Sequence, residues 1–96
     1  MNRAKRFKFR LYIAGGTENS VRAVTNLTAL CRKHLRDHHE IEVVDVLREP
    51  RRALVDGIFM TPALITLGPG PVQKIIGTLS HTETVLATLG LEATAA

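Results

Sequence analysis

The most constraining feature of this sequence is a long helical pattern between two short strand patterns. Over residues 7–13 apolar side chains alternate with Lys8, Arg10 and Tyr12, which predicts a strand with one apolar face. Residues 41–47, IEVVDVL, are rich in β-branched residues and predict a second strand. Between them, a spacing of three and four residues predicts a helix from about Ser20 to about Asp37. Its buried stripe would consist of Val21, Val24, Leu27, Cys31 and Leu35. This order favours a right-handed crossover between parallel strands.

The middle of the chain predicts a short helix and a third strand. Pro50 suits the first turn of a helix, where its missing N–H costs little, and this helix should end near Asp56. Pro62 cannot donate a hydrogen bond to a sheet, so we expect it at the beginning of a strand. The apolar run over residues 63–67 is that strand.

A hairpin and a last helix complete the predicted fold. The composition of residues 68–71, GPGP, predicts a turn, so residues 72–77, VQKIIG, should pair antiparallel with the preceding strand. Ser80 and Glu83 stand at the spacing of a capping box, which predicts the start of a helix. Gly90 is the expected end of that helix.

The predicted order, β-α-β-α-β-β-α, is the order of a thioredoxin. A thioredoxin carries a Cys-x-x-Cys pair after its first strand, whereas the loop here contains Gly16, Thr17, Glu18 and Asn19. Cys31 is the one cysteine of the chain, and its place on the apolar stripe predicts a buried structural thiol. The alternative is a thioredoxin-like thiol oxidoreductase or redox sensor that uses Cys31.

The length of 96 residues predicts one domain, with an ordered core over about residues 7–89, a basic N-terminal arm and a frayed C-terminal tail. No apolar run approaches the roughly 20 residues needed to cross a bilayer. The apolar residues of the N-terminus alternate with charges, unlike those of a signal peptide. We therefore expect a cytoplasmic protein with no membrane partner.

Positive charge is unevenly placed, and the net charge is +4. Such clusters favour an acidic partner through long-range attraction. Binding of nucleic acid is not expected, because base stacking needs exposed aromatic residues and the chain has three Phe, one Tyr and no Trp. An acidic protein surface is the better candidate. The clusters are Arg3, Lys5, Arg6, Lys8 and Arg10, then Arg32, Lys33 and Arg36, then Arg48, Arg51 and Arg52.

Other polar residues predict neither a metal nor a cofactor site. His34 and His38 have a spacing that can place two imidazoles on one metal, but no cysteine or carboxylate pattern completes the site. Gly15 and Gly16 lack the rest of a phosphate-binding motif, so we expect them to form a tight turn with positive φ. Asp45 has no catalytic partner motif and is expected to be a hydrogen-bond anchor.

Four stretches, LYIAGGTENSVRA, VVDVLREP, MTPALI and PVQKIIGTLS, together resemble the KaiB family of clock proteins. The resemblance is collinear and spans nearly the whole domain. It implies a thioredoxin-like α/β fold without catalytic activity or cofactor, whose C-terminal half refolds into a self-associating form, a tetramer or dimer. It also implies binding to a KaiC-type ATPase in circadian or daily timing or in stress adaptation. A KaiA-like protein and a histidine kinase are further partners that it suggests.

The resemblance also assigns roles to individual residues. Arg22 and Lys74 match basic positions of the family motifs and would meet acidic groups on a partner or a neighbouring subunit; the alternative is a solvated charge. Family members often carry Gly-Leu-Asp where this chain has residues 88–90, so the balance between the two forms depends on these positions. The expected partner-binding residues are Arg22, Lys74, Lys8, Arg10, Thr17 and Asn19. The expected switch residues are Pro62, Gly68, Pro71, Gly77, Thr88 and Gly90.

Overall fold

The computed structural model describes residues 6–36 and 38–91 and contains one four-stranded sheet. The elements in chain order are β1 (Phe7–Ile13), α1 (Glu18–His34), β2 (His39–Asp45), α2 (Pro50–Val55), β3 (Ala63–Gly68), β4 (Gln73–Ile76) and α3 (Thr82–Thr88). The strand order is β2-β1-β3-β4, with β1 parallel to β2 and β3 antiparallel to both β1 and β4. This is the predicted thioredoxin-like arrangement.

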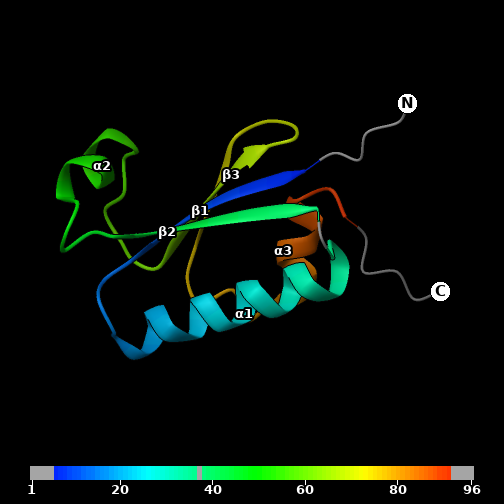
Figure 1. The fold of residues 1–96 in the computed structure, drawn as a ribbon, viewed down its shortest axis with the longest axis horizontal. Coiled ribbons are helices and arrows are strands. Elements are labelled where there is room, and N and C mark those ends of the chain that lie inside the picture. Colours follow the sequence, from blue (N-terminus) through cyan, green and yellow to red (C-terminus); the bar gives the residue numbers. More distant parts are fainter. Residues whose placement is uncertain (1–5, 37, 92–96) are drawn as a thin grey trace.

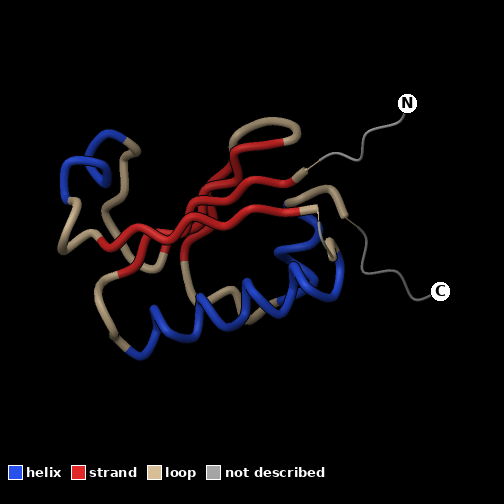
Figure 2. Tube along the Cα trace, in the orientation of Figure 1, coloured by secondary structure: helices blue, strands red, loops and turns tan. Residues whose placement is uncertain are grey.

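Two helices lie along one face of the sheet, and the third sits at its end. Figure 1 shows α1 and α3 below the strands, while α2 forms a separate lobe beyond the ends of β1 and β2. The same division is visible in Figure 2, where a loop on each side connects α2 to the strands. The sheet therefore has a well-covered face and a face that α2 covers in part.

Each face of the sheet has its own core. Phe9 and Leu11 of β1 are buried against the α1 side chains of Leu27 and Cys31. On the opposite face, Tyr12 is buried in the second cluster. That cluster comprises Tyr12, Val44, Ala53, Ile58, Ala63 and Ile65. The predicted apolar face of β1 is therefore confirmed, and α2 in addition covers Tyr12 on the other face.

Several predicted boundaries are confirmed. Pro50 opens α2, and the antiparallel hairpin of β3 and β4 lies where the GPGP turn placed it. Pro62 precedes β3 directly, in a cis peptide bond with Thr61. Gly90 ends α3: it has a φ of 78°, and its N–H and that of the following residue bond to carbonyls of the last turn.

Other expectations are corrected. Val21 is more than half exposed, because the buried stripe of α1 runs through Ser20 and Ala23. α1 also begins and ends before the predicted bounds. The capping box at Ser80 does not form, since the N-cap of α3 is His81 and has no side-chain cap. Residues 1–5, 37 and 92–96, which include parts of the predicted arm and tail, lie outside the described residues.

Candidate binding surface

The loop after β1 is held by hydrogen bonds at the place where a thioredoxin carries its cysteines. The buried Ser20 hydroxyl oxygen accepts from the backbone N–H of Ala14 at 3.0 Å and from the Thr17 hydroxyl at 2.8 Å. Thr17 occupies the N-cap position of α1, but its side chain does not bond to the helix backbone. Thr17 and Asn19 are both exposed on this loop and first turn. The loop is thus a fixed, sulfur-free surface.

Asp45 connects this loop to the loop after β2. One carboxylate oxygen accepts from the backbone N–H of Gly15 at 3.1 Å and of Leu47 at 2.9 Å. The prediction of a hydrogen-bond anchor is confirmed. Gly15 has a φ of 57°, and an added Cβ would lie 3.3 Å from a methyl carbon of Leu47, so the predicted tight turn requires glycine there.

Cys31 is a buried structural thiol, as predicted. It lies within the α1 core, and desolvation raises its pKa to about 12. A thiol with such a pKa is protonated at neutral pH and is therefore a poor nucleophile. The structure does not favour the oxidoreductase alternative.

The structure places the predicted partner-binding residues in two groups. Thr17, Asn19 and Arg22 lie at the start of α1, where Arg22 pairs with Glu18 at 3.1 Å and stays largely exposed. The other group consists of Lys8, Arg10 and Lys74, which share the sheet face that carries Tyr12.

Within the second group, the basic side chains differ in their freedom. The register aligns Arg10 with Ile65 and Ile65 with Lys74, so the two basic residues flank one apolar residue. Lys74 is exposed, and its ammonium donates to the carbonyl of Gly57 at 2.8 Å. Arg10 is three-quarters covered and bound to two carboxylates. Their role in binding a partner stays a prediction.

A polar network missed by the sequence analysis holds α2 on this face. The Tyr12 hydroxyl donates to Asp56, and the Arg10 guanidinium binds Asp56 at 3.0 Å and Glu42 at 2.9 Å. Arg52 of α2 binds the other oxygen of Glu42 at 2.8 Å. The facing positions of Arg10 and Glu42 on parallel strands were a usable signal, whereas Asp56 lies far away in the sequence.

These contacts shift the pKa values of the network. The hydrogen bond from Tyr12 and the pairing with Arg10 lower the pKa of Asp56. Hydrogen bonds from Arg10 and Arg52 lower the pKa of Glu42 in the same way. Desolvation, followed by the bond to Asp56, raises the pKa of Tyr12 to about 12. At neutral pH, Asp56 and Glu42 are therefore ionised and Tyr12 is protonated, and the network fastens α2 to the sheet.

The sequence analysis also missed an exposed apolar segment around α2. We call residues 46–60 the α2 lobe. Five of its large apolar side chains are 64–85% exposed. They are Leu47, Leu54, Val55, Phe59 and Met60. Exposed apolar groups gathered in one segment mark an interaction site more often than isolated ones do.

The predicted switch residues also fall into two groups. The N–H of Gly77 donates to the carbonyl of Pro62 at 2.9 Å, so these two residues pair at the open end of the hairpin, opposite its turn. The other four line one cavity of about 170 Å³ between the β3–β4 turn and the end of α3. They are Gly68, Pro71, Thr88 and Gly90.

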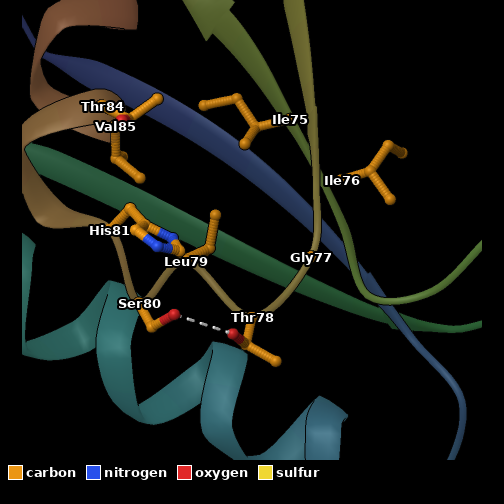
Figure 3. A pocket seen from close by; sticks show the side chains of 9 residues that line it. All are labelled: Ile75, Ile76, Gly77, Thr78, Leu79, Ser80, His81, Thr84 and Val85. Atoms are coloured by element: carbon orange, nitrogen blue, oxygen red, sulfur yellow. Dashed lines mark hydrogen bonds between the residues drawn. The ribbon is translucent and has the colours of Figure 1, made fainter.

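A second cavity, of about 300 Å³, lies between β4 and α3 (Figure 3). The side chains of Ile75, Leu79 and Val85 line it, and the Thr78 hydroxyl donates to that of Ser80 at 3.2 Å at its edge. Leu79 has a φ of 64° although it is not glycine. The segment from Gly68 to Gly90 is thus bordered by two cavities and contains one strained residue.

Among the described residues, no three His, Cys, Asp or Glu side chains are grouped as metal ligands would be. In the same part of the chain, no helix has the length and apolar character needed to cross a membrane. The described surface carries exposed basic, hydroxyl and apolar side chains.

Comparisons with solved structures establish the fold. The N-terminal domain of SasA from Synechococcus elongatus matches with a TM-score of 0.76 and 20% identity, over 93% of this chain and 84% of that one. Thioredoxin from Fasciola hepatica matches with a TM-score of 0.71 and 15% identity, over 91% and 82%. At such identities the likeness shows the thioredoxin-like fold alone.

Comparisons of sequence establish the family. The model of the KaiB domain matches residues 10–91. The circadian clock protein KaiB3 of Synechocystis sp. is 44% identical over 87 residues, which are 91% of this chain and 83% of that protein. The circadian clock oscillator protein KaiB of Thermosynechococcus vestitus is 42% identical over 87 residues, 91% and 81% of the two chains. The chain therefore belongs to the KaiB family of circadian clock proteins.

Proposed function

We propose that this chain binds a KaiC-type ATPase and modulates its phosphorylation and ATPase cycle, without catalysing a reaction itself. Family membership supports a role as a clock regulator. The proposal that the chain is not an enzyme is supported by the absence of a reactive thiol where a thioredoxin has its redox cysteines. The loop after β1 has no cysteine, and the thiol of Cys31 is buried with a pKa of about 12.

We further propose that the segment from Gly68 to Gly90 can rearrange and that the chain self-associates as a dimer or tetramer. Left-handed backbone at a residue other than glycine costs about 1–2 kcal/mol, and Leu79 adopts it inside this segment. Two surface pockets also border β4 and α3 within this segment. A KaiA-like protein and a histidine kinase remain predicted further partners.

Cys31→Ser is the variant that distinguishes binding of the ATPase from thiol oxidoreductase activity. We expect the wild type and Cys31→Ser to bind the purified KaiC-type ATPase of the same organism with affinities within about threefold of each other, since Cys31 does not reach the surface. Binding is measured by pull-down with and without ATP after hours of incubation. Insulin reduction, with a thioredoxin as positive control, measures reductase activity.

Two results would contradict the proposal. The first is no binding of the wild type under either nucleotide condition. The second is turnover of a disulfide at a rate like that of a thioredoxin, with loss of this turnover in Cys31→Ser. The second result would restore the oxidoreductase alternative, because no other sulfhydryl exists in the chain.

Lys74 gives a prediction about the charge of the contact. We expect Lys74→Glu to weaken binding of the ATPase by about tenfold or more, because it places a negative charge on a surface that favours acidic partners. Lys74→Arg, which keeps the charge, should stay within about threefold of the wild type. Titrations by biolayer interferometry measure both. Equal affinities for Lys74→Glu and the wild type would remove Lys74 from the binding surface.

A further inference from the structure

The α2 lobe presents its apolar side chains outward on a fixed support. Val55 and Phe59 are 84% and 85% exposed, more than any other large apolar residue in the described part of the chain. The lobe is nevertheless anchored, because Ala53 and Ile58 are buried in the second core and Asp56 is bound to Tyr12. The exposure therefore does not result from loose packing of α2.

The charges of the lobe leave it with a positive rim. Both of its acidic side chains are in ion pairs: Asp56 binds Arg10, and Glu49 lies 3.4 Å from Arg52. Within residues 6–36 and 38–91, neither Arg48 nor Arg51 forms an ion pair, and both are exposed. Arg48 lies beside Leu47 in the sequence, and Arg51 lies in the first turn of the helix that carries Leu54 and Val55.

This charge pattern distinguishes between two occupants of the apolar surface. A second copy of the chain that used the same surface would place Arg48 and Arg51 near the same residues of its partner, since a two-fold interface pairs a patch with itself. Like charges brought together in this way oppose association. A different protein with carboxylates around an apolar centre would instead be attracted to the rim and would cover the apolar side chains.

We infer that the α2 lobe is a docking surface for an acidic-rimmed apolar surface of the ATPase, and that self-association uses another part of the chain. This inference rests on the proposed function. Val55 and Phe59 supply the central contact, because energetic hot spots are large apolar or aromatic groups that a partner desolvates. Arg48 and Arg51 accelerate the encounter and determine its dependence on salt.

The test compares two sets of surface substitutions of the same chemical kind. In the lobe variant, Leu54→Gln, Val55→Gln and Phe59→Ser are combined. In the control, Val43→Gln and Val72→Gln alter exposed apolar residues on β2 and at the β3–β4 turn, away from the lobe. We expect the lobe variant to bind the purified ATPase at least about tenfold more weakly and the control within about twofold. Circular dichroism and thermal unfolding verify that both variants are folded.

Arg51→Glu provides an independent measurement, which does not depend on the folding of the lobe variant. We expect it to lower the association rate with the ATPase by about tenfold at low salt, with a smaller change at high salt. If wild type, lobe variant and Arg51→Glu all bind alike, the inference is wrong while the proposed function stands. If the wild type itself fails to bind, both are wrong.

Two further readouts decide between occupants. Light scattering should give the same oligomeric mass for the wild type and the lobe variant; a smaller mass for the variant would assign the lobe to self-association instead. Vesicles of phosphatidylserine and phosphatidylcholine should not retain the wild type in sedimentation. Retention of the wild type and loss of it in the lobe variant would assign the lobe to a membrane surface.

Discussion

Replacing Asp56 with alanine should lower the free energy of unfolding by about 2–3 kcal/mol, because it leaves the buried Tyr12 hydroxyl and one side of the Arg10 guanidinium without their partner. Asp56 is 22% exposed, so water compensates for part of the loss. Tyr12→Phe removes one hydroxyl but leaves the ion pair of Asp56 with Arg10, and should cost about 1 kcal/mol. Urea unfolding at constant protein concentration measures both values.

Glu18→Ala is the matched control for Asp56→Ala. It also removes a carboxylate that pairs with an arginine, but Glu18 and Arg22 are both largely exposed. Such a pair should contribute no more than about 0.5 kcal/mol. Equal effects of Asp56→Ala and Glu18→Ala would mean that the network does not fasten α2 to the sheet.

The pH dependence of the same variant gives a second readout. The folded-state pKa of Asp56 lies below its ordinary value of 3.8, so its contribution to stability is fully present above about pH 4 and is lost as the pH falls through the lowered pKa. The difference in unfolding free energy between wild type and Asp56→Ala should therefore be constant near neutral pH and decrease in more acidic solution. A difference that grows on acidification would contradict this assignment.

The order of the elements could be predicted because each one has a local signal. Alternation over residues 7–13, the proline at position 50 and the GPGP turn all act within a few residues, and the structure places a strand, a helix start and a hairpin there. Asp45 could be predicted as an anchor because no catalytic motif accompanies it. The motifs shared with the KaiB family added the predicted partner-binding and switch residues, which no local pattern indicates.

The contacts that link distant segments could not be predicted from local patterns. Tyr12 alternates with the apolar residues of β1 and so lies on the other face of the strand, where α2 covers it and Asp56 accepts a hydrogen bond from its hydroxyl. Ser20 is polar and was left out of the buried stripe, although the N–H of Ala14 and the Thr17 hydroxyl satisfy its oxygen inside the protein. Tyr12 bonds to a distant segment and Ser20 to the loop just before it, and in both cases the hydrogen bond makes the burial of a polar group possible.

The shifted stripe of α1 leads to the largest expected effect of a single substitution. Leu27→Ala should lower the free energy of unfolding by about 2–5 kcal/mol, because Leu27 is 1% exposed and the deletion leaves a cavity in the core that α1 shares with the sheet. Val21 was predicted on the same stripe, but it is 54% exposed. Val21→Ala on the same helix should therefore change the stability by less than about 0.5 kcal/mol.

Denaturant unfolding of both variants at one protein concentration distinguishes the predicted stripe from the observed one. If the helix were rotated so that residues 21 and 24 faced the sheet, Val21→Ala would be clearly destabilising. Ala23→Leu tests the orientation of α1 by adding volume on its buried side. Ala23 is fully buried, so the larger side chain should lower the free energy of unfolding by about 1–3 kcal/mol through overpacking. A neutral Ala23→Leu together with a destabilising Val21→Ala would contradict the orientation of α1, because only a helix turned toward Val21 leaves space at position 23.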